Sequence, residues 1–136
     1  MVCIYCSGHT RVANSRPQRR LHQTWRRRIC TECGAVFTTN EAIDLSTSVA
    51  VRKSDGRLSP FNRDVLFMSV YKAVGHREHA VTDAAALTST ITSKLLNDTE
   101  AAVDPKDITK AALSVLKRFD KAAAVQYAAY HKQPSH

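Results

Sequence analysis

Two pairs of cysteines place the strongest constraint on how this chain can fold. Each pair has the spacing C-x2-C, and 23 residues lie between the pairs, which is enough for a hairpin. Zinc prefers four deprotonated ligands in a tetrahedron, and two such pairs supply four sulfurs from two segments of chain. No position is then left open for water, so the expected zinc ion is structural. The predicted ligands are Cys3, Cys6, Cys30 and Cys33.

Other uses of the cysteines remain open, namely four reduced structural thiols or a redox-active pair. The start of the chain lacks a charged segment followed by an apolar one, so it is unlike a secretory signal. In a reducing cytosol, paired cysteines point to metal rather than to disulfides. No apolar run approaches the roughly 18 residues that cross a bilayer. We therefore expect no membrane partner.

Residue usage divides the 136-residue chain into two parts. Residues 1–45 hold every cysteine and seven arginines but no lysine, and a segment this short needs metal or disulfides to stay folded. Residues 46–136 lack cysteine, and their apolar residues recur at helical spacing. We predict an α+β protein. A small β-rich zinc domain over 1–45 precedes a mainly helical domain over 46–136, which a β-hairpin opens.

The second part begins with a strand pattern over 48–53 and a return over 58–61. Between them the pair Asp55-Gly56 is a strong hairpin signal. Four helices are expected next: one capped by Asn62, one starting at Thr82-Asp83, one opened by Asp104-Pro105, and a well-buried one from Lys121 to His131. The first helix has the apolar stripe Leu66, Phe67, Val70, Tyr71 and Val74. The second has Ala84, Leu87, Ile91 and Leu95 on one face, and the third has Ile108, Ala111, Val115 and Phe119. The tail over 132–136 is expected to fray.

Arginine dominates the segment between the cysteine pairs, where no acidic residue occurs, and the whole chain carries a formal charge of +8. The planar guanidinium binds phosphate through two hydrogen bonds and can also read guanine. One or two arginines could merely offset the charge of about −2 on a zinc tetrathiolate. The number present favours a nucleic-acid surface, for which the candidates are Arg11, Arg16, Trp25, Arg26, Arg27 and Arg28.

Strand alternation separates three of these arginines. Arg26 and Arg28 fall on one face of a strand and Arg27 on the other. From the sequence alone, Arg26→Ala or Arg28→Ala is expected to weaken DNA binding and to reduce its salt dependence. Trp25 either packs under the neighbouring arginines or lies against the nucleic-acid backbone.

The order of these residues resembles a known family. In the first part it reads Met1-x-Cys3-x-x-Cys6, then Thr10-Arg11-Val12-x-x-Ser15-Arg16-Pro17, then Trp25-Arg26-Arg27-Arg28-x-Cys30-x-x-Cys33-Gly34-x-x-Phe37-Thr38-Thr39-x-Glu41. This resembles the NrdR family, bacterial transcriptional repressors of ribonucleotide reductase genes. The second part resembles that family's ATP-cone through Val51-Arg52-Lys53-Ser54-Asp55-Gly56-Arg57, Pro60-Phe61-Asn62-Arg63 and Phe119-Asp120-Lys121-Ala122-Ala123-x-Val125-x-Tyr127-Ala128.

The resemblance implies a zinc ribbon joined to an ATP-cone. ATP and dATP would act as allosteric effectors that change a homo-oligomer formed through the cone, and the oligomer would decide whether the ribbons bind paired operator boxes in double-stranded DNA. Such a protein is bacterial, cytoplasmic and nucleoid-associated. The implied nucleotide contacts are Val51, Arg52, Lys53 and Arg57. Without the resemblance, a lysine beside an Asp-Gly turn is an ordinary solvated residue.

The chain departs from the family pattern at two positions, and two other functions remain open. Ser54 stands where the family commonly has arginine, and Gln126 where it tends to have arginine. The rivals are a zinc-ribbon adaptor of the transcription or translation machinery that ignores nucleotides, and a detached regulatory fragment of a reductase. The sequence has no Walker-type glycine loop and no catalytic constellation, so no enzyme activity is expected.

Overall fold

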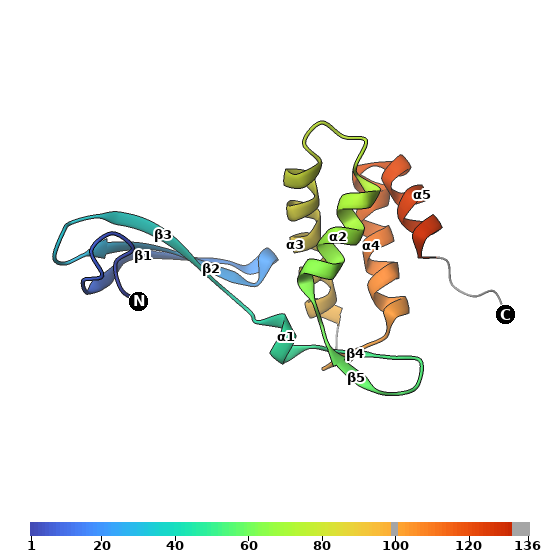
Figure 1. The fold of residues 1–136 in the computed structure, drawn as a ribbon, viewed down its shortest axis with the longest axis horizontal. Coiled ribbons are helices and arrows are strands. Elements are labelled where there is room, and N and C mark those ends of the chain that lie inside the picture. The colour runs from blue at the N-terminus through green and yellow to red at the C-terminus, as the bar shows by residue number, and fades with distance from the viewer. Residues whose placement is uncertain (99–100, 132–136) are drawn as a thin grey trace. The chain divides into compact units, whose positions relative to one another are not determined.

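Two units of structure follow one another along the chain. The computed structural model describes residues 1–98 and 101–131. It divides into Met1–Ile43 and Asp44–His136, each with its own internal packing (Figure 1). The expected frayed tail over 132–136 lies outside the described residues.

The first unit is a three-stranded antiparallel sheet. Its strands are β1 (Thr10–Gln18), β2 (Gln23–Cys30) and β3 (Val36–Ala42), in the order β1-β2-β3. A short 3-10 turn, η1 (Arg19–Leu21), joins β1 to β2. A hairpin between the cysteine pairs was expected and is present. The third strand was not predicted, although its threonine-rich sequence suits a strand.

The second unit is a helical bundle with a small sheet at one end (Figure 1). The predicted hairpin and four helices are all present, and the structure adds a one-turn helix and a two-residue strand. In chain order the elements are α1 (Leu45–Ser48), β4 (Ala50–Arg52), β5 (Leu58–Pro60), α2 (Arg63–Ala73), α3 (Ala80–Asp98), β6 (Ala102–Val103), α4 (Pro105–Phe119) and α5 (Lys121–Tyr130).

The small sheet holds the hairpin against the start of α4. β4 pairs antiparallel with β5, and Gly56 in the turn has a positive φ of 85° that glycine adopts without strain. β4 also pairs in parallel with β6, whose last residue lies two positions before Pro105. Two residues are too few to produce a recognisable strand pattern, so only the folded chain reveals β6.

Side-chain caps fix the starts of the helices. Asn62 Oδ1 accepts hydrogen bonds from the amides of Asp64 at 2.9 Å and Val65 at 3.3 Å, which confirms it as the cap of α2. Asp104 precedes Pro105, the first residue of α4, as expected. α3 begins at Ala80, two residues before the predicted start, because termini without a strong capping residue are poorly marked in sequence.

The core of the second unit lies between α2, α3, α4 and α5. The apolar face predicted for α3 is fully confirmed, since its four residues are buried: Ala84, Leu87, Ile91 and Leu95. The other helices contribute Leu66, Val70, Val74, Ala111, Leu116, Ala123 and Tyr127. Helical periodicity therefore identified most of the packing.

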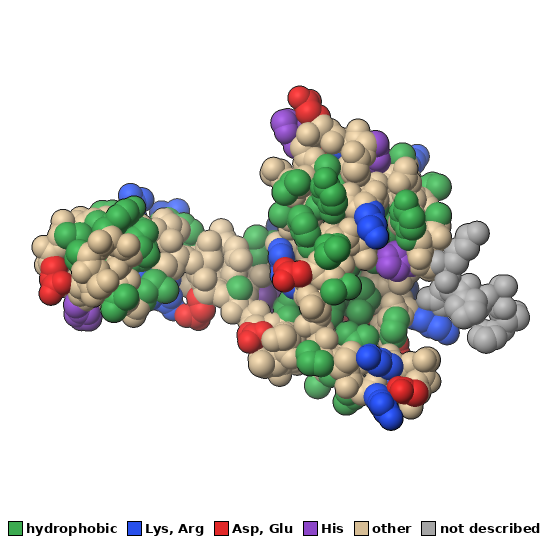
Figure 2. Space-filling model, viewed as in Figure 1, with side chains coloured by type: hydrophobic (Ala, Val, Ile, Leu, Met, Phe, Trp, Pro, Cys, Tyr) green, Lys and Arg blue, Asp and Glu red, His purple; other side chains and the backbone are tan. Residues whose placement is uncertain are grey.

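Three expectations about burial are corrected. Tyr71 is 43% exposed and Phe119 is 39% exposed. Tyr71 follows the fully buried Val70 by one residue, or about 100° around the helix, which places it at the edge of the stripe. Phe119 instead lies under the Arg77 guanidinium, 4.4 Å from its ring centroid. α5 is not buried all round either, because Val125 is 70% exposed. Hydrophobic side chains accordingly show over α2 in Figure 2.

Asp120 ties the loop between α2 and α3 to the junction of α4 and α5. Its Oδ2 lies 2.9 Å from His76 Nε2 and accepts a hydrogen bond from Arg77 Nη1 at 3.1 Å. Its Oδ1 accepts hydrogen bonds from the amides of Ala122 and Ala123, which caps α5. These bonds, first of all the one with His76, hold the pKa of Asp120 well below its usual range.

We predict that Asp120→Ala lowers the thermal midpoint of the helical unit by roughly 5 °C at neutral pH, because it removes both the cap and the ion pairs. A depressed carboxyl pKa contributes stability above the unfolded value of about 3.9, and this stability is lost as the pH falls below it. The difference in thermal midpoint between wild type and Asp120→Ala should therefore decrease in acid. Circular dichroism melts from pH 7 to pH 3 measure it, with Asp120→Asn as the control that keeps a capping oxygen. An equal difference at every pH would contradict the assignment.

Candidate zinc centre and nucleic-acid interface

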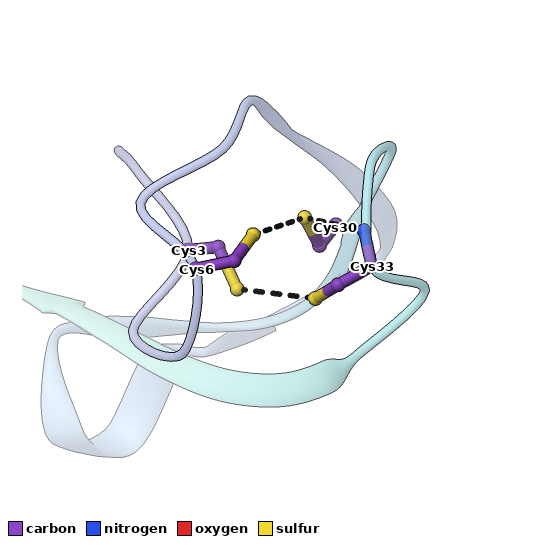
Figure 3. Close-up of side chains that lie close together, drawn as sticks. All are labelled: Cys3, Cys6, Cys30 and Cys33. Atoms are coloured by element: carbon purple, nitrogen blue, oxygen red, sulfur yellow. Dashed lines mark hydrogen bonds between the residues drawn. The ribbon is translucent and has the colours of Figure 1, made fainter.

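The four cysteine sulfurs converge at one end of the sheet. All four lie within 4.8 Å of one another. The Sγ atoms of Cys3 and Cys33 are 3.7 Å apart and those of Cys6 and Cys30 are 3.5 Å apart. The side chains point inward from two segments of the chain (Figure 3). A tetrahedron with Zn–S distances of about 2.3 Å has sulfurs about 3.8 Å apart, so the arrangement fits zinc.

Local backbone geometry holds the sulfurs in place. Backbone amides of Tyr5 and Gly8 donate to the Sγ atoms of Cys3 and Cys6, each at 3.4 Å. The amides of Glu32 and Cys33 donate to Cys30 Sγ in the same way. Gly34, with a φ of 75°, makes the turn after the second pair. Tight turns with amides directed at sulfur are what a thiolate centre requires.

The electrostatics of the centre call for a cation. The amides of Cys33 and Glu32 lower the pKa of Cys30 to about 6 against the cost of burial. At Cys6 the Gly8 amide lowers the pKa, but contacts with the sulfurs of Cys30 and Cys33 together with burial raise it to about 12. Thiolates this close together repel one another. A divalent metal removes this obstacle by stabilising every thiolate at once.

The candidate DNA residues divide between the two faces of the sheet. Directly paired residues share a face, and alternate residues of a strand point to opposite faces. One face, here called the open face, carries Arg11, Asn14, Arg16, Trp25, Arg27, Thr38 and Asn40. The other, here called the paired face, carries Ser15, Arg26, Arg28, Thr39 and Glu41.

The two arginines of the paired face have partners within the sheet. Arg26 Nη1 donates to Ser15 Oγ at 3.2 Å, and its Nη2 lies 3.6 Å from Glu41 Oε2. Arg28 Nε donates to Thr39 Oγ1 at 3.3 Å. The sequence pattern placed these two arginines together but gave no sign of their partners, which come from β1 and β3.

The four hairpin residues with an expected nucleotide role have different surroundings. Val51 is half-buried in β4, between Ser59 and Val103 of the neighbouring strands. Arg52 Nη1 donates to Asp104 Oδ1 at 2.9 Å, which links the hairpin to the cap of α4. Lys53 and Arg57 are exposed beside the turn, where basic and acidic side chains lie together (Figure 2). The two departures from the family pattern, Ser54 and Gln126, are also exposed.

A groove along α4 was not anticipated. Its lining includes Lys106, Thr109, Lys110, Lys117 and His131. The lysines recur at spacings of four and seven residues, so helical periodicity could have placed them on one face. The four hairpin residues are not among the described residues that line this groove.

Two known domain families match successive parts of the chain. The family described as "Transcriptional repressor NrdR-like, N-terminal domain" matches residues 1–41, and the ATP cone domain matches residues 49–134. A zinc ribbon followed by an ATP cone defines a regulatory protein that uses structural zinc and a nucleotide effector, not an enzyme. None of the helices within residues 1–98 and 101–131 has the length and hydropathy of a bilayer-spanning segment.

Whole-chain relatives identify the family. The Transcriptional repressor NrdR of Symbiobacterium thermophilum is 33% identical over 98% of this chain and 88% of its own length. That of Methylobacterium sp. (strain 4-46) is 37% identical over 97% of this chain and 71% of its own length. That of Sinorhizobium fredii is 34% identical over 100% of this chain and 87% of its own length. The chain belongs to the NrdR family of transcriptional repressors.

Proposed function

We propose that this protein represses ribonucleotide reductase genes by binding paired operator boxes in double-stranded DNA, with ATP and dATP as effectors. The observation that carries the proposal is an arginine-bearing sheet, with a four-cysteine centre at one end, in a chain of the NrdR family. We assign DNA binding to residues 1–45 and nucleotide sensing and oligomerisation to residues 46–136. The protein would act in the bacterial cytoplasm, associated with the nucleoid.

Phosphate contacts would supply most of the affinity for DNA. The contacts proposed from the sequence are Arg11, Arg16, Trp25, Arg26, Arg27 and Arg28, and Glu41 is the acidic residue of the three strands. Each arginine that neutralises a phosphate releases counterions, so binding should weaken steeply as salt rises. The zinc centre fixes the sheet on which these arginines lie.

The hairpin would sense the nucleotide through Val51, Arg52, Lys53 and Arg57. Exposed cations at Lys53 and Arg57 suit a triphosphate. The ion pair between Arg52 and Asp104 would couple nucleotide binding at the hairpin to the helical bundle. A phosphate that binds Arg52 competes with the carboxylate of Asp104, which precedes α4. A nucleotide that binds one oligomer better than another raises the population of that oligomer, and the affinity for DNA changes with it.

A gel shift against reductase promoter DNA, with and without ATP and dATP, tests the proposal beside mass measurements of the oligomers. We expect one nucleotide to favour the DNA-bound oligomer and the other to disfavour it. Calorimetric titration with each nucleotide gives an independent readout. Binding to DNA with no heat and no change of mass from either nucleotide would instead identify the nucleotide-independent zinc-ribbon adaptor. Failure to bind promoter DNA at low salt would point to the regulatory fragment of a reductase.

A further inference from the structure

The arginines of the sheet are not equivalent, because some are already engaged. On the paired face, Arg26 and Arg28 are half-buried and bonded to Ser15, Glu41 and Thr39. The arginines of the open face are exposed: Arg11, Arg16 and Arg27. Within the described part of the chain, their side chains make no hydrogen bond or ion pair.

The third strand shows the same difference between the faces. Thr38 and Asn40, on the open face, are exposed, whereas Phe37 and Thr39 on the paired face are half-buried. The acidic residue of the three strands, Glu41, also lies on the paired face. The open face is therefore both the more accessible and the more positive side of the sheet.

A β-bulge in β1 assembles the open face. Val12 pairs with Arg28, but Asn14 pairs with Arg27, so Ala13 is an extra residue in the strand. Arg11 and Arg16 are five positions apart, and regular alternation would place them on opposite faces. The extra residue brings them to the same face, where Arg27 lies opposite Asn14 between them.

Groups suited to bases accompany these cations. Trp25 lies opposite Arg16 on one side and Asn40 on the other. Asn14 uses its Oδ1 to accept the Ser15 amide at 2.8 Å, which leaves its NH2 group to donate. Asparagine amides read adenine in the major groove, which is wide enough for β-strands. The open face therefore combines arginines that suit phosphates with asparagines that suit base edges, as expected of a surface that binds duplex DNA.

We propose that duplex DNA binds the open face through Arg11, Arg16 and Arg27, and that Arg26 and Arg28 serve to hold the three strands together. The proposal rests on the DNA-binding function proposed above and assigns it to one side of the sheet. It reverses the expectation from sequence alone, in which Arg26→Ala and Arg28→Ala weaken DNA binding. Arg26 and Arg28 do lie on one face, but their side chains there contact Ser15, Thr39 and Glu41.

Single alanine variants of neighbouring arginines test the assignment, since Arg26, Arg27 and Arg28 are consecutive and, of the three, Arg27 lies on the open face. Fluorescence anisotropy would be measured on reductase promoter DNA and on a random-sequence duplex of equal length, over a series of salt concentrations. We expect Arg27→Ala and Arg16→Ala to weaken binding roughly tenfold. Each should also reduce the slope of log K against log salt by about 0.9, the value for one phosphate contact. Zinc content and the unfolding midpoint should not change.

The matched variants Arg26→Ala and Arg28→Ala should behave oppositely. Their salt slopes should equal that of the wild type, while the ribbon unfolds at a lower denaturant concentration. The one tryptophan of the chain, Trp25, lies on the open face, so its emission should change when DNA is added to the wild-type protein. This measurement requires no variant to fold.

Distinct outcomes would overturn the face assignment and the proposed function. A smaller salt slope in Arg26→Ala and Arg28→Ala, with a wild-type slope in Arg27→Ala, overturns the face assignment. An equal loss of DNA affinity in every variant also overturns it. If the wild type binds both duplexes equally, operator recognition is wrong, yet the variants on either duplex still decide the face. If the wild type binds neither duplex, both proposals are wrong.

Discussion

Replacing Cys30 by serine is expected to unfold residues 1–43 and to abolish DNA binding. Cys30 is 2% exposed and lies at the end of β2, where its Sγ accepts two backbone hydrogen bonds. Few large apolar side chains are buried in this unit, so metal binding supplies most of its folding free energy. Zinc content should fall from about one ion per chain to nearly none, and DNA affinity by at least about a hundredfold.

Metal analysis, anisotropy and circular dichroism check this result together. Chelation of zinc from the wild type should reproduce it, and so should acid, because protonated thiols do not bind zinc. Thr38→Ala, an exposed substitution on β3, is the control that should keep zinc and the fold. The helical signal should persist in every case, since the four ligands lie outside Asp44–His136. A Cys30→Ser protein that kept both its zinc and its DNA binding would refute the structural role of the metal.

Truncating Ile91 to alanine should have the largest effect on the helical unit. Its side chain is fully buried in the core, among residues of α2, α4 and α5. Removal of this much buried volume costs about 2–5 kcal/mol, because the surrounding side chains only partly fill the cavity. Denaturant unfolding followed by helix circular dichroism measures the loss.

The matched control lies on the same helix. Val81 is 61% exposed, and Val81→Ala should change the free energy of unfolding by no more than about 0.5 kcal/mol. Zinc content should be unaltered in Ile91→Ala, because α3 provides no ligand. Loss of zinc, or equal destabilisation by the two substitutions, would show that the core is assigned incorrectly.

Much of the fold follows from local signals in the sequence. Asn62 and Asp104 mark helix starts because their side chains or those of their neighbours satisfy free backbone amides. Asp55-Gly56 marks the hairpin because glycine accepts a positive φ. The errors arise where longer-range packing decides. Tyr71 has helical spacing yet lies at the edge of the core, and β6 exists only because β4 is beside it.

The candidate site shows the same division. The sequence by itself determined that four cysteines with this spacing meet in one metal centre, because zinc chemistry admits few other arrangements. It also determined that arginines are concentrated in the segment between the two cysteine pairs. Only the tertiary structure decided which arginines are available. Strand register decides three features: the bulge at Ala13, the pairing of β2 with β3, and the contacts of Arg26 with Ser15 and Glu41. Register is set between strands, and the alternation within a single strand does not encode it.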